Sequence, residues 1–235
     1  MFKIQIACLI AGALWCSAPG AAASSRRAVI ELYTSQGCSS CPPADTLLGE
    51  LAQQPNVLAL AFHVDYWNDL GWKDPYSLPD ATIRQTAYSR ARAHGSVYTP
   101  QVVVDGAEEF LGSDRSRIVR AVAGVRTGVP ITLDVAERNL VVALGSAQYL
   151  APSDVLAITF LRKATSKIGR GENSGRTLEE FNIVRSIRKI GQWSGEAATF
   201  EVPLSTVPRD ATDFAVLVQL RGQMQIIGAA TRPLH

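Results

Sequence analysis

Short apolar runs alternate with segments of helical period along the first half of the chain. The runs at 29–34 and 56–63 are typical of buried strands, and those at 101–105 and 107–111 predict a hairpin that turns at Gly106. Between them, apolar residues recur every three or four positions, which predicts helices. The expected helices and their inward faces are 44–53 with Ala44, Leu47, Leu48, Leu51 and Ala52, 80–94 with Ile83, Ala87 and Ala91, and 113–125 with Ile118, Val119 and Val122. Asp80 and a Ser or Asp at 113–114 are expected to cap the second and third helices. The predicted order is therefore β-α-β-α-β-β-α.

The second half has mostly a period of two, which is typical of strands. Gly, Pro, Asn and Asp separate the strands, and residues 169–175 predict a hairpin loop. The expected strands are 131–136, 140–144, 155–163, 181–190, 198–202, 214–220 and 226–231. Seven short strands without helices favour an all-β, sandwich-like domain. We therefore expect an α/β domain over 24–127 and a β domain over 128–235, divided near 126–130.

Residues 1–23 have the pattern of a secretory signal peptide. Lys3 precedes an apolar stretch over 4–18, and Ala21-Ala22-Ala23 supplies small residues for cleavage. Cys8 and Cys16 lie in this segment, but neither stands in a good lipidation motif. The expected location is therefore periplasmic or secreted, with no membrane span after cleavage. The mature chain would keep two cysteines, Cys38 and Cys41.

The composition and the motifs of the chain argue against several classes of function. The formal net charge is +2, with 23 Lys+Arg and 21 Asp+Glu, so nothing indicates nucleic acid as a partner. At 47% hydrophobic residues, the chain can build a core without metals or several disulfides. It has no phosphate-binding loop and no G-x-S-x-G motif, and nothing indicates a nucleotide, flavin or haem. We therefore expect no cofactor.

The motif Cys38-Ser39-Ser40-Cys41-Pro42-Pro43 lies between the first expected strand and the first expected helix. A thiol at a helix N-terminus is stabilised as thiolate by free backbone N–H groups, and this is expected of Cys38. Cys41 lies one turn away and could resolve a mixed disulfide. The alternative is a permanent Cys38–Cys41 disulfide that braces the turn.

The element order, with C-x-x-C after the first strand, resembles the thioredoxin fold. The strings ELYTSQGCSSCPPAD, FHVDYWNDLGWKDP and YTPQVVVDG are similar to the DUF1223 family of exported bacterial proteins, whose members join a thioredoxin-like domain to a β-rich part. The segment 65–79 is then an insert. The resemblance implies a cis Pro100 that faces the cysteines, with Thr99 offering backbone groups to an extended peptide. An ordinary trans proline at a strand start is the alternative.

The same resemblance implies a buried acid that relays a proton to the resolving cysteine. Glu31 is the candidate, although its spacing of seven residues from Cys38 departs by one from the usual spacing. The alternatives for Glu31 are an exposed position on the strand or a pair with an arginine.

Aromatic residues are dense in the insert, where Trp67 and Trp72 could line a recognition surface or anchor the loop. A weaker hypothesis is a Cu(I) or zinc site formed by Cys38, Cys41, His63 and Asp65. We expect a thiol–disulfide oxidoreductase that acts on cysteine-containing exported proteins or a redox partner. The alternatives are a metal-binding or redox-sensing module and a non-catalytic adaptor with a structural disulfide.

Overall fold

A computed structural model describes residues 24–93, 95–148 and 151–234, so the expected signal peptide lies outside the described residues. The first half has the predicted order of strands and helices, preceded by one short strand. Its elements are β1 (Ser24–Arg26), β2 (Ala28–Thr34), α1 (Pro42–Leu51), β3 (Val57–His63), α2 (Pro79–Ala91), β4 (Gln101–Val104), β5 (Glu108–Leu111) and α3 (Arg115–Val122).

The second half contains β-strands and one short 3-10 helix among its described residues. Its elements are β6 (Arg126–Gly128), β7 (Ile131–Ala136), β8 (Asn139–Leu144), β9 (Ser153–Lys167), β10 (Thr177–Trp193), β11 (Ala198–Pro203), η1 (Leu204–Thr206), β12 (Asp213–Leu220) and β13 (Ile226–Pro233). All seven expected strands are present. β9 and β10 are longer than expected because their facing ends, 164–167 and 177–180, are mostly polar, which an apolar pattern does not detect.

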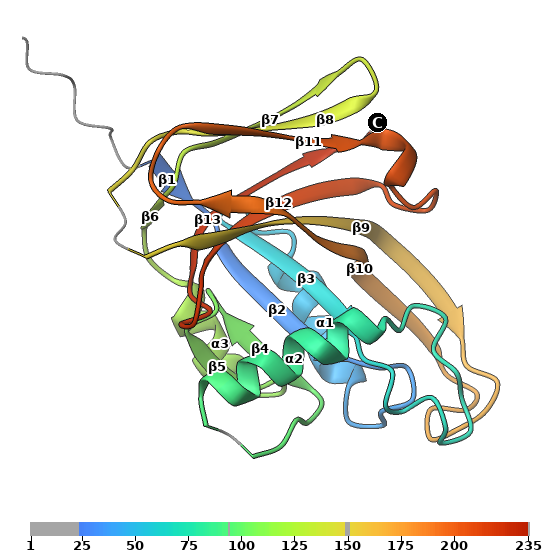
Figure 1. Ribbon diagram of the computed structural model, residues 1–235. Helices are drawn as coiled ribbons and strands as arrows, with labels where there is room; N and C mark the ends of the chain where they lie inside the picture. The colour runs from blue at the N-terminus through green and yellow to red at the C-terminus, as the bar shows by residue number, and fades with distance from the viewer. Residues whose placement is uncertain (1–23, 94, 149–150, 235) are drawn as a thin grey trace, which may run out of the picture.

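One eight-stranded sheet runs through both halves in the order β13-β12-β9-β10-β3-β2-β4-β5. β10 lies parallel to β3, with Ile183 opposite Ala61, so the sheet crosses the boundary expected near 126–130. The β9–β10 hairpin extends beyond the other strands, and its tip lies near the loops that follow β2 and β3 (Figure 1). A segment about 130 residues downstream therefore contacts the loop that follows β2, since Gln36 Nε2 donates a hydrogen bond to Ser166 Oγ at 2.9 Å.

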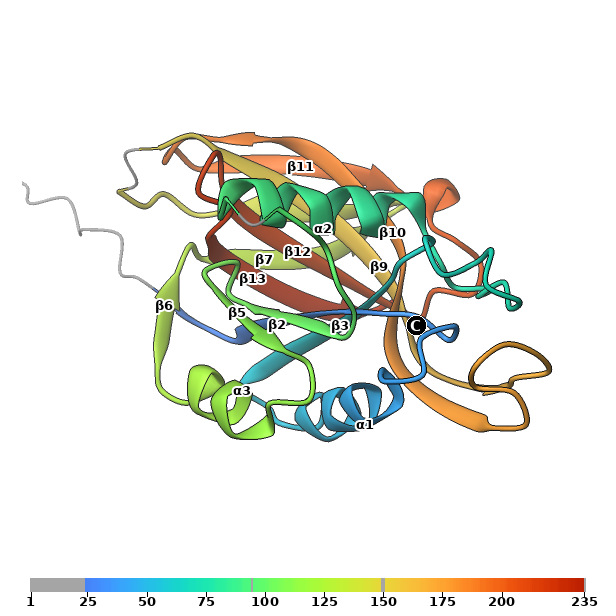
Figure 2. The ribbon, with the colours of Figure 1, turned by 90° about the horizontal axis from the view of Figure 1, so that it is seen from below.

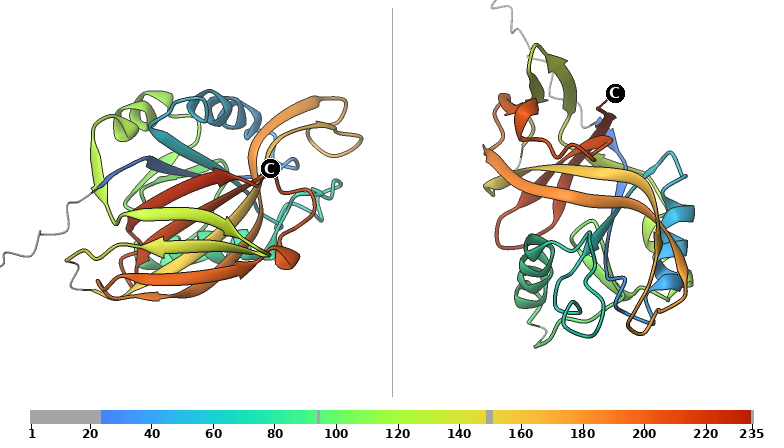
Figure 3. Two further views of the ribbon diagram at one scale, coloured as in Figure 1. Left: turned by 90° about the horizontal axis from the view of Figure 1, so that it is seen from above. Right: turned by 90° about the vertical axis from the view of Figure 1, so that its right-hand side faces the viewer.

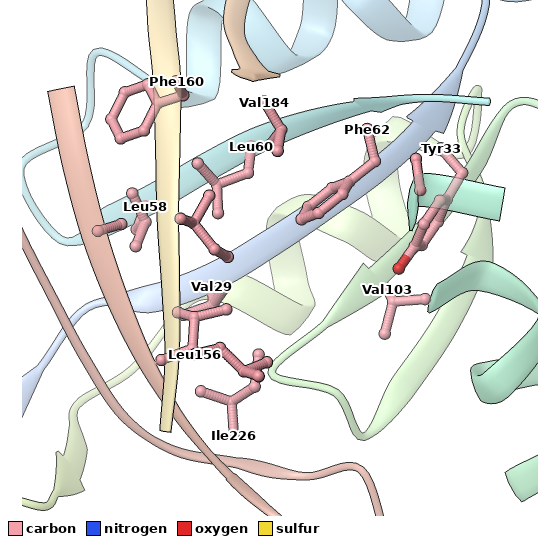
Figure 4. Packing of buried hydrophobic residues seen from close by; sticks show 14 of the residues in the cluster. Val29, Tyr33, Leu58, Leu60, Phe62, Val103, Leu156, Phe160, Val184 and Ile226 are labelled. Carbon is pink, nitrogen blue, oxygen red and sulfur yellow. The ribbon is translucent and has the colours of Figure 1, made fainter. Parts of the chain in front are cut away.

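Helices cover both faces of the part of the sheet formed by β3, β2, β4 and β5. α1 and α3 lie on one face and α2 lies on the other (Figure 2). The alternation of β2 separates these faces, because Ile30 and Leu32 pack with α1 while Val29 and Tyr33 pack on the α2 side. Side chains of β3, β9 and β13, including Leu58, Leu156 and Ile226, extend into the core on the α2 side (Figure 4).

A second sheet, in the order β11-β8-β7, packs on the other face of β9, β12 and β13 (Figure 3). Leu140, Val142 and Leu144 point inward from β8 and meet Val155, Phe214 and Val216. This sandwich agrees with the alternating pattern of the second half. None of the helices in the described part of the chain is long and apolar enough to cross a membrane.

The predicted inward face of α2 is wrong. Ile83 is 65% exposed, whereas the buried residues of α2 are Ala81, Arg84, Gln85, Tyr88 and Ser89. The predicted cap is also wrong, since Leu78 is the N-cap and Asp80 lies inside the first turn. The helix buries polar groups that find partners on distant strands, so its apolar residues do not mark the inward face. In α3, Ile118 and Val122 are buried as expected, but Val119 is 40% exposed.

Candidate functional site

Cys38 and Cys41 form a disulfide in the loop between β2 and α1. Cys41 is the N-cap of α1, and its carbonyl oxygen accepts hydrogen bonds from the N–H groups of Ala44 at 2.8 Å and Asp45 at 3.1 Å. The residue next to the helix is therefore Cys41, and Cys38 lies three positions earlier. Both cysteines are 0% exposed.

The tip of the β9–β10 hairpin holds the disulfide loop. Asn173 is fully buried, and its Nδ2 donates to the carbonyl oxygens of Gln36 and Cys38, both at 2.9 Å. Glu172 Oε2 accepts a hydrogen bond from Ser39 N at 3.3 Å. The second half of the chain thus bonds directly to the backbone of the C-x-x-C loop.

The insert 65–79 holds the same loop from another side. Trp72 Nε1 donates to Gln36 Oε1 at 2.8 Å, and a side chain at Gly171 would meet Trp72 Cβ at 3.1 Å. Trp67 Nε1 donates to Thr99 Oγ1 at 2.9 Å, and a side chain at Gly37 would meet Trp67 Cβ at 3.1 Å. Both tryptophans are partly buried, so these contacts anchor the insert on the disulfide loop.

Thr99 and Pro100 lie beside the first turn of α1. The Thr99–Pro100 peptide bond is cis, as expected. A side chain at Gly112 would meet Pro100 Cβ at 2.6 Å and Ala44 Cβ at 3.0 Å, so Pro100 and the start of α1 pack closely. The structure therefore gathers Thr99, Pro100 and Trp67 around the C-x-x-C loop.

Close to this loop lies a group of ionisable residues, the buried His63, Asp74 and Glu180 and the half-buried Asp45, which we call the His63 cluster. His63 Nδ1 lies 2.7 Å from Asp74 Oδ2, and His63 Nε2 lies 3.9 Å from Glu180 Oε1. Gln36 links this cluster to the disulfide loop, because its N donates to Asp74 and its Nε2 donates to Glu180, both at 2.9 Å.

The His63 cluster contains two groups that titrate in unusual ranges. Burial raises the pKa of Asp45 to about 7, with a further rise from Glu180 and Asp74 and an opposing effect of His63. Burial alone would lower the pKa of His63, but the charges of Asp74, Glu180 and Asp45 outweigh it and raise that pKa to about 9. Burial also opposes ionisation of Asp74, yet His63 and two backbone N–H groups hold its pKa below the usual value.

At neutral pH, His63 is consequently a cation paired with Asp74, and the raised pKa of Asp45 lies near neutral pH. Asp45 also lines a hollow of about 580 Å³ between α1 and β10, so this partly buried carboxyl group can exchange protons with solvent.

Glu31 lies on the other face of the sheet, away from α1. Its Oε1 accepts a hydrogen bond from Arg84 Nε at 2.6 Å, and its Oε2 accepts one from the Tyr88 hydroxyl. Arg84 and Tyr88 also bond to Gln219. We call Glu31, Arg84, Tyr88 and Gln219 the Arg84 cluster. This placement corrects the expected proton relay through Glu31 and favours its pairing with an arginine, because strand alternation turns Glu31 away from the cysteine side.

The hypothetical metal ligands do not come together. Asp65 Oδ1 accepts a hydrogen bond from Thr82 Oγ1 at 2.5 Å, His63 is held by Asp74, and the two cysteines are bonded to each other. No group of three His, Cys, Asp or Glu side chains among residues 24–93, 95–148 and 151–234 is placed to hold a metal ion.

Sequence reasoning missed Asp45, Asp74, Glu180 and Asn173. Asp45 had a local signal, since a carboxylate in the first turn of a helix that follows a C-x-x-C motif lies near the cysteines. The other three have none, because they reach the site only through the insert and the long hairpin.

The chain is similar to one protein family and to known solved structures. The profile of a family described as "Protein of unknown function (DUF1223)" matches residues 29–219. The crystal structure of protein AGR_C_4864 from Agrobacterium tumefaciens is 31% identical, with a TM-score of 0.73 over 89% of this chain and 95% of that one. HBP35 of Porphyromonas gingivalis is similar in fold, with a TM-score of 0.60 and 14% identity over 89% of this chain and 76% of that one.

Among curated proteins there is no match. The family profile covers most of the chain, including the disulfide loop, the insert and the β9–β10 hairpin. The chain therefore belongs to the DUF1223 family, whose function is unknown.

Proposed function

We propose that this protein is an exported thiol–disulfide oxidoreductase whose α/β part has a thioredoxin-like arrangement. Its substrates would be cysteine-containing exported proteins or a dedicated redox partner, in the periplasm or outside the cell. One observation carries the proposal: the Cys38–Cys41 disulfide lies in the loop between β2 and α1, and the cis Pro100 packs near the first turn of α1.

The chemistry of the oxidised form is a two-step exchange. A substrate thiolate attacks Cys38 Sγ, the Cys38–Cys41 bond breaks, and Cys41 leaves as a thiolate. A second substrate thiol, once deprotonated, attacks the mixed disulfide and releases Cys38. The substrate loses two electrons and becomes a disulfide, and the protein gains them as two thiols. The reverse sequence reduces a substrate disulfide.

We assign to Asp45 the transfer of the proton that Cys41 gains when the disulfide is reduced. Its N–H bonds to the Cys41 carbonyl oxygen, so it lies within one helical turn of the leaving sulfur. Its pKa of about 7 allows it to hold or release a proton at neutral pH. In this proposal, Asp45 has the proton-relay role that the sequence analysis considered for Glu31.

Access to the disulfide requires the hairpin tip to move, because an attacking thiolate must reach a sulfur that is fully buried. Asn173 supplies two of the bonds that hold the tip closed. The tip is a loop that contains three exposed glycines, Gly169, Gly171 and Gly175, whose backbone freedom allows the loop to change conformation.

The same burial favours a second candidate, a structural disulfide that braces the junction of the two halves. The reduction potential of the pair distinguishes the two functions. Equilibration of residues 24–235 with glutathione and dithiothreitol is expected to give a value between about −120 and −270 mV for an exchange catalyst. A value below about −300 mV would support the structural role instead.

Exchange kinetics test the access route. Asn173→Ala is expected to accelerate attack of dithiothreitol on the disulfide at least about tenfold, since each bond to a buried carbonyl contributes on the order of 1 kcal/mol. Asn139→Ala removes an exposed Asn139–Glu201 bond and serves as the control. Equal rates for the two variants would show that the tip does not limit access. Cys41→Ser should trap a mixed disulfide on Cys38, and Cys38→Ser should trap none.

A further inference from the structure

A cavity of about 530 Å³ lies where β3 and β10 separate. The two strands pair at Ile183 and Ala61, and Asn182 Nδ2 donates to the Ala59 carbonyl oxygen at 2.8 Å. Asn182 has a φ of 47°, a left-handed conformation that turns β10 away at this point. The start of β3 is left unpaired with β10, and the cavity opens there, beside the end of α1.

The floor of this cavity is apolar. Val57 and Leu58 from β3 and Phe160 from β9 line it, and Phe181 from β10 and Ala52 from α1 complete it. Phe160 lies at the same end of the core as Leu58 (Figure 4), so the cavity reaches the margin of the main hydrophobic core. Its volume lies in the range of small-molecule sites.

The rim of the cavity is basic. Arg27, Arg162, Lys163 and Arg232 line it together with one acid, Asp213. Asp213 pairs with Arg162, while Lys163 and Arg232 pair with exposed carboxylates outside the cavity. Arg27 is exposed and forms no ion pair with any residue in the described ranges. The rim therefore carries an excess of positive charge over an apolar floor.

We propose that this cavity binds a single-chain amphiphile with an anionic head group, such as a medium-length fatty carboxylate. The chain lies on Val57, Leu58, Phe160 and Phe181, and the head group bonds to Arg27 and its basic neighbours. The site lies at the opposite end of α1 from the disulfide, so it does not depend on the redox proposal.

Calorimetric titration of residues 24–235 with monomeric dodecanoate tests the site. Affinity is expected to rise about threefold to fourfold per methylene from octanoate to dodecanoate, as apolar burial predicts. Dodecanol, which lacks the charge, should bind about tenfold more weakly than dodecanoate. No binding of dodecanoate, or equal binding of dodecanol, would overturn the proposal.

The position of the bound dodecanoate is tested by methyl NMR and by one matched pair of variants. Dodecanoate should shift the methyl signals of Val57 and Ala52 but not those of the exposed Val125. Arg27→Glu should weaken binding of dodecanoate about tenfold. Arg90→Glu, the same charge reversal at an exposed position of α2, should leave the binding unaltered. Shifts elsewhere, or equal effects of the two variants, would overturn the assignment.

A flotation assay with vesicles distinguishes binding of a free amphiphile from binding to a membrane surface. Vesicles of anionic phosphatidylglycerol should not retain the protein in a flotation assay, because the cavity receives one chain and not a bilayer. Retention that Arg27→Glu abolishes, without binding of monomeric dodecanoate, would overturn the proposal in favour of a membrane site.

Discussion

Two ionic clusters lie on opposite faces of the same eight-stranded sheet, and they differ in charge balance. The Arg84 cluster has one cation, Arg84, against one carboxylate, Glu31, with Tyr88 and Gln219 completing the hydrogen bonds. The His63 cluster has one cation, His63, against the carboxyl groups of Asp45, Asp74 and Glu180. The first is balanced, and the second has an excess of acid.

The two clusters, which differ in charge balance, also differ in the pH range in which their groups titrate. In the Arg84 cluster, the charge of Glu31 raises the pKa of Arg84 and burial raises that of Tyr88, so neither group titrates near neutral pH. It joins α2 to β2 and β12 and holds the two halves together. In the His63 cluster, burial raises the pKa of Asp45 to about 7, and the surrounding carboxylates raise the pKa of His63 to about 9 against the effect of burial. Asp45 and His63 therefore titrate closer to neutral pH than Arg84 and Tyr88 do.

The largest expected effect comes from unbalancing the Arg84 cluster. Arg84→Met leaves Glu31 buried without a counter-charge and should lower the free energy of unfolding by about 3–5 kcal/mol in urea denaturation. The double variant Glu31→Gln/Arg84→Met, which removes both charges, should recover at least half of that loss. A double variant as unstable as Arg84→Met would show that packing, and not charge balance, explains the effect.

The next effect depends on pH. The folded pKa of His63, about 9, lies above its usual value of 6.5, so its stabilisation is complete below pH 6.5 and disappears as pH rises through 9. His63→Gln should therefore lower the free energy of unfolding by about 3 kcal/mol at pH 6 and by much less at pH 10. Asp74→Asn should move this loss to lower pH, because Asp74 raises the pKa of His63. A difference independent of pH would contradict the ion pair.

Asp45 should act in the opposite direction. Its folded pKa, about 7, lies above the usual 3.8, so its ionisation destabilises the fold progressively as pH rises from 3.8 to 7. Asp45→Asn should raise the free energy of unfolding at pH 8 by about 2 kcal/mol, a value reduced by its contact with solvent. It should also remove the pH dependence of disulfide exchange around pH 7. The same substitution at exposed Asp69 should do neither.

The smallest effect tests the link between the insert and the His63 cluster. Trp72→Phe keeps the ring but removes the 2.8 Å bond to Gln36, which should cost about 1 kcal/mol in urea denaturation. It should also alter the pH profile of exchange, because Gln36 bonds to Asp74 and Glu180. Trp67→Phe loses a bond to Thr99 instead and should leave that profile unchanged.

Local patterns predicted most of the fold. β7 was expected at its observed bounds, and the C-x-x-C motif was placed between the right strand and helix, because both depend on neighbours in sequence. The inward face of α2 was predicted wrongly for the converse reason. Arg84 and Tyr88 are buried because Glu31 and Gln219 meet them, and these partners lie 53 and 135 residues from Arg84 along the chain.

The sequence by itself determined the order of elements, the strands of the second half and the pair of cysteines, since periodicity and spacing are short-range properties. Only the tertiary structure decided that β10 extends the sheet at β3, that the hairpin tip bonds to the backbone of the disulfide loop, and that Glu31 pairs with Arg84. These features arise from contacts between distant segments. Hydrogen-bond partners that satisfy a buried polar group leave no periodic signal in either segment.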